Sequence, residues 1–152
     1  MPIDIRFAPY GALVLRVALG VMYLAHSLVL KLVTFGLPGT AGFFAKVGLP
    51  EWLAYITFAA EVAGGLLLIF GIKTRWVALA LVLPLLGAII WVHGANGWVF
   101  TAPGGGWEYP AFLIAASLAQ ALIGDGAYAL FPSTGSNAPA SFASTQSKEA
   151  RP

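Results

Sequence analysis

The chain has 152 residues, of which 59% are hydrophobic and only 9% charged, with a formal net charge of +2 and a mean hydropathy of +0.85. A soluble domain carries about 25% charged residues, so this composition indicates one membrane domain. The scattered basic residues give no surface for nucleic acid. Because the chain has no cysteine, disulfides, thiolate metal sites and thiol nucleophiles are excluded, and we expect no bound metal.

A short leader at residues 1–9 precedes the first apolar segment, which runs from about 10 to 35. It is too long for the core of a secretory signal and lacks a clear cleavage site, so we interpret it as a membrane span. Its polar side chains share one helical stripe, which should face the bundle interior. The members are Arg16, Gly20, Tyr23, Ser27 and Thr34, with Lys31 beside them and His26 at the edge.

The connection at 37–50 is too short and too rich in glycine to span a bilayer. Thr40 could cap a short interfacial helix that groups Phe43, Phe44 and Val47 and leaves Lys46 near the headgroups. A plain connecting loop is an equally good interpretation.

The second span, at about 52–72, is long enough to cross a ~30 Å hydrocarbon core and carries Glu61 near its middle. A carboxylate at that depth costs several kcal/mol unless it faces protein or water, so it needs a partner. Thr57, Gly64, Gly65 and Leu68 share its face, and the adjacent glycines allow a neighbouring helix to approach closely.

Two further spans follow, at about 76–93 with Pro84 inside it and at about 109–129. A kink at Pro84 is tolerable where neighbouring groups satisfy the freed carbonyl. Between these spans, the aromatic and glycine-rich stretch 94–108 has no lysine or arginine, so it either folds over the bundle mouth or is an ordinary surface loop. The Ser, Ala and Pro-rich tail at 132–152 should be disordered.

The fold prediction is therefore an all-α, four-helix transmembrane bundle, spanning residues 10–131, with a short interfacial helix and a Gly-rich outer loop. Basic residues set its orientation. The N-terminus, second connection and tail carry five of them, whereas the first and third connections carry only Lys46. The positive-inside rule then places both termini in the cytoplasm.

Rise per residue brings several polar groups together in the outer half of this bundle. At 1.5 Å per residue, His26 lies about 8 Å and Glu61 about 14 Å below the outer boundary, while His93 and Glu108 lie near it. These four side chains form the predicted cluster. In a structural alternative, each charge is paired only to let the helices assemble, Glu61 with Arg16 or His26.

Five stretches, in this order and spacing, resemble the DoxX family of small bacterial membrane proteins: RVALGVMYLAHSLVLKL, GFFAKVGLP, AEVAGGLLLIFGIKTR, HGANGW and GGGWEYP. The resemblance covers about Ala12–Phe131 and implies a four-helix membrane bundle. The positions that match the recurrent polar motifs of the family are His26, Lys31, Glu61, His93, Asn96, Trp107, Glu108 and Tyr109. The family takes its name from a subunit associated with quinone-linked oxidation of sulfur compounds, and other members are linked to quinone or oxidative-stress responses.

Three function classes follow. The first is a redox-associated subunit of the bacterial inner membrane that binds a quinone or similar aromatic molecule. Its electrons would come from a partner protein or a bound cofactor, because the chain has no dinucleotide fingerprint and no iron–sulfur cysteines. The second is a small-molecule or proton-linked transporter, which would need a homo-oligomer. The third is a non-catalytic assembly subunit. The sequence leaves open which class applies and whether a reaction is catalysed.

The predicted ligand-binding residues are His26, Glu61, His93, Asn96, Trp107 and Glu108, and the predicted structural partners are Arg16, Tyr23 and Lys31. Haem ligation by the two histidines is disfavoured, because their estimated depths differ by about 8 Å.

Overall fold

The protein is all-helical across residues 6–133, the part of the chain that the computed structural model describes. The predicted tail beyond residue 133 and the start of the leader lie outside this range. The elements in chain order are α1 (Ala8–Leu24), η1 (Ala25–Thr34), α2 (Leu37–Lys46), α3 (Trp52–Phe70), α4 (Thr74–Ala80), α5 (Val82–Ala88), η2 (Ile89–His93), η3 (Gly94–Asn96) and α6 (Glu108–Ile123). The all-α prediction is confirmed.

Within residues 6–133, three helical stretches are long and apolar enough to cross a membrane: Ala8–Thr34, Trp52–Phe70 and Thr74–Asn96. Large apolar side chains cover the outside of the described structure; Leu83 and Leu122, for example, are 70% and 80% exposed. Such a surface is suited to lipid rather than water, so the protein is a membrane protein that lies in a bilayer.

The fourth helix, α6, has 16 residues and is shorter than the span expected at 109–129. It ends at Ile123 because Gly124 leaves the helical conformation with φ +100°. At 1.5 Å per residue α6 is about 24 Å long, somewhat less than a ~30 Å hydrocarbon core.

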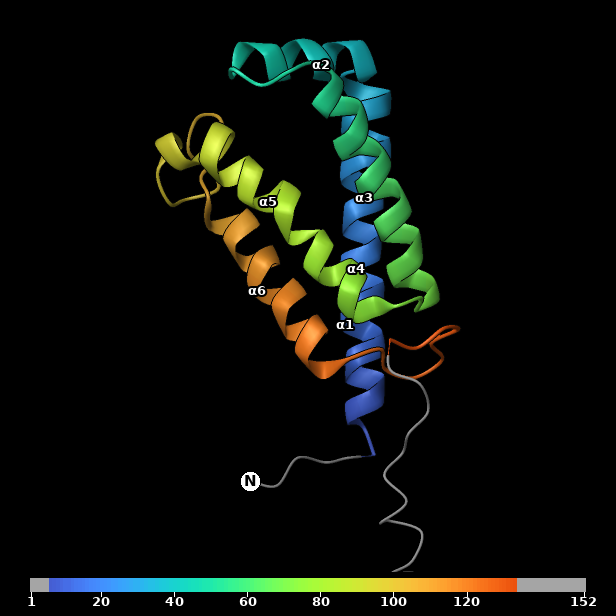
Figure 1. Cartoon of the computed structure of the whole chain (residues 1–152). Coiled ribbons are helices and arrows are strands. Elements are labelled where there is room, and N and C mark those ends of the chain that lie inside the picture. Colours follow the sequence, from blue (N-terminus) through green and yellow to red (C-terminus); the bar gives the residue numbers. More distant parts are fainter. Residues whose placement is uncertain (1–5, 134–152) are drawn as a thin grey trace, which may run out of the picture.

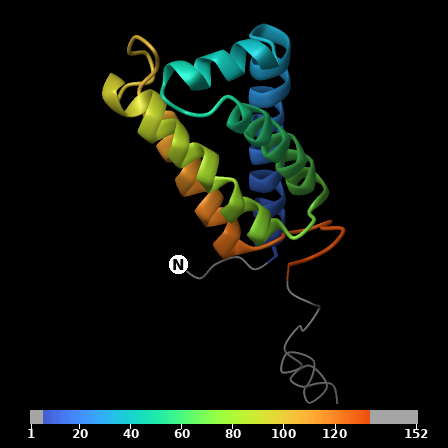
Figure 2. The ribbon, with the colours of Figure 1, turned by 45° about the horizontal axis from the view of Figure 1, so that its top comes forward.

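The long helices form two antiparallel pairs (Figure 1). α1 packs along α3, and α4 and α5 pack along α6. Figures 1 and 2 both show the two pairs meeting near the N-terminal end of α1 and diverging toward α2. The α3–α4 connection lies at the same end of the bundle as the N-terminal end of α1, and the glycine-rich stretch 94–108 lies at the opposite end. This arrangement follows from the predicted alternation of the spans.

Two glycines bring α1 and α3 together. A Cβ built on Gly20 would lie 2.7 Å from the carbonyl oxygen of Gly65, and one built on Gly65 would lie 2.9 Å from the carbonyl oxygen of Gly20. Both positions are buried, as are Glu61, Gly64 and Leu68 on the same face of α3. The close helix approach expected from the adjacent glycines of α3 is therefore present.

Gly20→Ala is expected to lower the free energy of unfolding by roughly 1–3 kcal/mol, because the new methyl group overlaps backbone atoms that cannot move independently. Gly11→Ala is the matched control, since it lies in the same helix and a Cβ there meets nothing within 4 Å. Thermal unfolding in detergent measures both variants. Equal melting temperatures would contradict tight packing at Gly20.

The polar stripe of the first span is buried from Arg16 through Gly20 and Tyr23 to Ser27, but Thr34 is exposed. The chain adopts π-helical geometry from Ala25, so each residue turns the helix less than in an α-helix. Over seven residues this difference rotates Thr34 away from the stripe.

The short helix α2, predicted to lie at the membrane interface, begins at Leu37, earlier than the expected cap at Thr40. Gly36, with φ +69°, precedes it and makes the sharp turn from η1. The Thr40 hydroxyl instead donates to the carbonyl oxygens of Lys31 and Gly36, at 3.2 and 3.0 Å, which ties α2 to the end of η1.

The third span is interrupted at Leu81, between α4 and α5. Pro84 has no N–H to donate to the carbonyl of Ala80, so the helix cannot continue regularly there. The Tyr23 hydroxyl donates to the neighbouring Leu81 carbonyl at 3.1 Å and lies 3.4 Å from Ser117 Oγ. Tyr23 thereby links α1 to both helices of the second pair.

The chain after α6 folds back across the ends of α3 and α4. Lys73 donates its backbone N–H to Phe131, and Asp125 accepts the backbone N–H of Thr74, the first residue of α4, at 3.0 Å. Burial alone would raise the pKa of Asp125, but hydrogen bonds from Ser133 and Thr74 outweigh it and lower the pKa. This carboxylate therefore caps α4 from a distant part of the sequence.

Candidate functional site

Glu61, the carboxylate at mid-span, pairs with Lys31. The Lys31 ammonium and the Ser27 hydroxyl both donate to Oε2 of Glu61, which joins η1 to α3. The side chains of Lys31 and Glu61 are only 13% and 8% exposed. Lys31 therefore supplies a positive partner for the Glu61 carboxylate within the protein. The sequence suggested Arg16 or His26 as that partner, but neither bonds to Glu61.

Arg16 lies at the opposite end of α3. Its Nη1 donates to the carbonyls of Leu68 and Ile69 at 3.0 and 2.9 Å, and its Nη2 donates to Ala127 at 2.8 Å. A guanidinium placed on the last carbonyls of a helix satisfies groups that have no partner within the helix and complements its dipole. Arg16 therefore fixes helix ends rather than the outer cluster.

His26 lies in the same π-helical segment as Lys31 but makes no hydrogen bond or ion pair with Glu61. Its side chain is exposed and lines a small pocket of about 250 Å³ with Tyr109 of α6. Lys31, Glu61 and His93 all lie within electrostatic range of its ring. His26 thus lies within electrostatic range of the ion pair but lines a pocket together with α6.

His93 and Asn96 hold the glycine-rich loop. His93 Nδ1 lies 2.9 Å from the carbonyl oxygen of Gly105, and Asn96 Nδ2 lies 3.0 Å from the same atom. Because a carbonyl oxygen only accepts, Nδ1 must carry the proton, which leaves Nε2 of a neutral ring as an acceptor. These two predicted ligand-binding residues therefore have a structural role in positioning the loop.

The glycines of this loop are required by their surroundings. Gly104 and Gly105 have φ values of +81° and +75°, which residues with a side chain rarely adopt. A Cβ on Gly106 would lie 2.3 to 2.6 Å from three carbonyl oxygens. Replacing all three by alanine should therefore disrupt the loop rather than only stiffen it.

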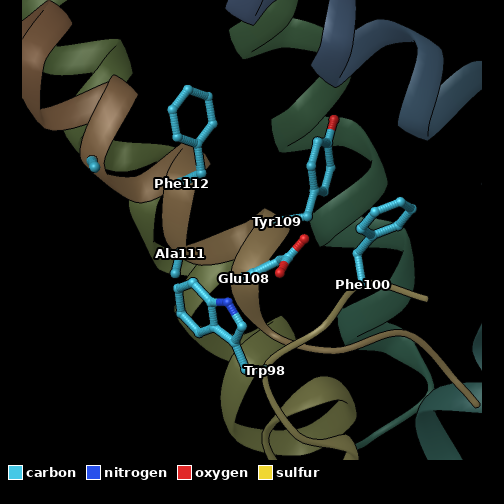
Figure 3. Close-up of a pocket in the computed structure, with 7 residues that line it drawn as sticks. Trp98, Phe100, Glu108, Tyr109, Ala111 and Phe112 are labelled. Carbon is cyan, nitrogen blue, oxygen red and sulfur yellow. The ribbon is translucent and has the colours of Figure 1, made fainter. Parts of the chain in front are cut away.

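An open groove of about 690 Å³ lies where the loop joins α6. We call it the Glu108 groove, and its lining residues are Trp98, Phe100, Glu108, Tyr109, Ala111, Phe112 and Ala115. Figure 3 shows the Glu108 carboxylate between Tyr109 and Phe100 on one side and the Trp98 indole on the other. Within residues 6–133 no group donates a hydrogen bond to this carboxylate.

Aromatic packing places the loop wall of the groove. Trp107, a predicted ligand-binding residue, packs edge-on against Trp98 with ring centroids 4.4 Å apart and does not line the groove. Glu108 donates its backbone N–H to Trp98, which fixes the start of α6. Sequence reasoning missed Phe112 and Ala115, although their spacing from Glu108 along a helix is the signal that places them on its face.

The predicted outer cluster is therefore divided into three parts. Glu61 is enclosed with Lys31, His93 anchors the loop, and Glu108 faces the groove with His26 across Tyr109. Neither histidine bonds to Glu108, so the expected closure of the cluster from above is absent. No group of three or more metal-ligating side chains occurs in the part of the chain that the structure describes.

The sequence profile of the DoxX family matches residues 11–94. The chain is 38% identical over 122 residues to a protein named "Putative oxidoreductase CatD" from Bacillus subtilis (strain 168), and the alignment covers 80% of this chain and 85% of that relative. No solved structure gives a significant match. The matched family range includes Glu61 and both histidines and ends before Glu108.

Proposed function

This chain belongs to the DoxX family, and on that basis we propose that it is a redox-associated protein of the bacterial inner membrane that binds a quinone or a similar aromatic small molecule in the Glu108 groove. The observation that carries the proposal is a carboxylate that accepts no hydrogen bond from any residue between 6 and 133 and lies among four aromatic side chains. The name of the Bacillus relative supports the redox association. Ligand pockets typically measure about 300–1,000 Å³, and the groove falls within that range.

The groove suits the chemistry of a quinone ring. Trp98, Phe100 and Phe112 offer aromatic surface for the ring, and Glu108 can exchange a proton with a ring oxygen. Reduction of a quinone to a hydroquinone takes up two electrons and two protons. Glu108 and His26 would pass the protons, and a partner redox protein would supply the electrons, because the chain has no cysteine to hold an iron–sulfur cluster.

The orientation of the protein forms part of the proposal. Arg6, Lys73 and Arg75 lie at the end where α3 joins α4, and Lys46 lies at the other end. The positive-inside rule supports cytoplasmic termini and places the Glu108 groove in the outer half of the membrane. Labelling of a cysteine introduced at Asn96 from the cytoplasmic side alone would contradict this orientation.

Glu108→Gln is expected to weaken binding of a short-chain hydroquinone by about tenfold or more, because a hydrogen bond to a charged group contributes roughly 1.5–3 kcal/mol. Quenching of tryptophan fluorescence in nanodiscs measures the affinity, since Trp98 lines the groove. Glu51→Gln is the matched control, because Glu51 is exposed just before α3 and does not line the groove.

Equal affinities of wild type and Glu108→Gln for the hydroquinone would show that Glu108 does not contact the ligand. Absence of quinone and hydroquinone binding by the wild type would refute the proposal. The non-catalytic assembly role would then be the better interpretation, because the enclosed Lys31–Glu61 pair serves helix assembly equally well.

A further inference from the structure

The Glu108 groove runs along the helix that forms its floor. Glu108, Ala111, Phe112 and Ala115 recur every three or four residues on one face of α6, over a length of about 10 Å at 1.5 Å per residue. Trp98 and Phe100 belong to the loop that precedes α6, so they wall the groove near Glu108. The groove therefore has a loop end and an end that opens along a membrane helix.

The two ends differ in chemistry. The only charged lining group is the Glu108 carboxylate at the loop end, whereas Ala111, Phe112 and Ala115 are apolar. A carboxylate accepts hydrogen bonds and repels anions, so it selects a hydroxyl donor and disfavours the phosphate of a phospholipid. Phe112 is 69% exposed, which leaves the far end of the groove open to lipid.

From this division, and resting on the proposed function, we propose that the ligand is a membrane-resident aromatic alcohol with a hydrocarbon tail, such as a prenylated or alkylated hydroquinone. Its hydroxyl donates to Glu108 at the loop end. Its tail lies along Ala111 and Ala115, where the small side chains leave room, and continues into the bilayer. The ligand thus enters sideways from the membrane.

A second path for the tail of a ligand bound at Glu108 runs past Tyr109. That residue also lines the pocket on α1 and η1 that contains Ala25 and His26. The α6 path is favoured because Ala111 and Ala115 line the same groove as Glu108, whereas Tyr109 is the only residue common to the two pockets. The two paths are distinguished by filling each with a bulky side chain.

The experiment compares two ligands with the same ring, a decyl hydroquinone and its methyl analogue, in nanodiscs of fixed lipid composition. Ala115→Phe should weaken binding of the decyl compound by about tenfold or more and change binding of the methyl compound less than twofold. Ala25→Phe should leave both affinities unchanged. Ala63→Phe is the matched control, because Ala63 is also an exposed alanine on a membrane helix, and it corrects for partitioning into lipid. Ala115→Leu gives a smaller obstruction if the Phe variant folds poorly.

The outcomes separate this inference from the proposed function. Loss of decyl binding in Ala25→Phe but not in Ala115→Phe would overturn the tail path. Binding of both compounds by every variant would also overturn it, while the proposed function would stand. Failure of the wild type to bind either compound would overturn both.

Discussion

Lys31→Met is expected to destabilise the protein by roughly 3–5 kcal/mol, the usual cost of removing one partner from a buried ion pair. The variant leaves the Glu61 carboxylate enclosed between η1 and α3 with only the Ser27 hydroxyl as a donor. Glu61→Leu should cost less, because the long Lys31 side chain can extend toward the headgroups and recover hydration. Chemical or thermal unfolding in detergent gives the difference.

A double-mutant cycle tests whether the two residues act as a pair. Lys31→Met combined with Glu61→Leu removes both charges, so the double variant should be more stable than Lys31→Met alone and close to wild type. Ser27→Ala should cost about 1 kcal/mol, as for loss of one hydrogen bond. If the two charge substitutions change the free energy of unfolding additively, Lys31 and Glu61 do not stabilise the protein as a pair.

Elements with strong periodicity could be predicted from the sequence. The apolar length around Glu61, the glycines on its face and the polar stripe from Arg16 to Ser27 each reflect a constraint that repeats along a helix. The packing of Gly20 against Gly65 follows from that constraint. The burial of Glu61 also follows, since an ionised group in a span must face protein.

The identity of the partner of Glu61 could not be predicted from depth alone. Depth arithmetic assumes an α-helix, but the chain is π-helical from Ala25, a change that has no clear composition signal. In this geometry Ser27 and Lys31 face α3 while His26 faces α6. The residues of the predicted cluster are therefore separated because they lie on different faces of η1, which an estimate of depth does not show.

The Glu108 groove could not be predicted as a whole, because it is formed by contacts between separate parts of the sequence. Glu108 and the aromatic loop could be recognised as candidates from their composition. Their arrangement as a groove requires the turn at Gly104 and Gly105 and the anchoring of the Gly105 carbonyl by His93 and Asn96. These contacts leave no periodic pattern, so the sequence did not indicate that His93 holds the loop.

Arg16 shows the same limit at the other end of the molecule. Its place on the inward stripe was correctly predicted, but a stripe of polar residues does not show which atoms the guanidinium contacts. Its acceptors are backbone carbonyls, which every residue has and which therefore give no sequence signal. One of them belongs to the chain after α6, which composition suggested would be helical to residue 129. The early end of α6 at Gly124 makes that contact available.

Arg16→Leu is expected to cost more than 3 kcal/mol, because hydrogen bonds from a charged donor contribute roughly 1.5–3 kcal/mol each and three carbonyls lose theirs, two at the end of α3 and one in the chain after α6. Arg16→Lys should be intermediate, since a single ammonium cannot reproduce the planar fork that reaches Leu68, Ile69 and Ala127 together.

Arg75→Leu is the control for the loss of an arginine at this end of the molecule. Within residues 6–133 its side chain makes no hydrogen bond, although it is partly buried near Gly124. Thermal unfolding should therefore separate Arg16→Leu clearly from Arg75→Leu, and limited proteolysis between residues 124 and 133 should accelerate only in the Arg16 variants. If both leucine variants melt alike and cleave at the same rate, the three carbonyl contacts do not hold the chain after α6 in place.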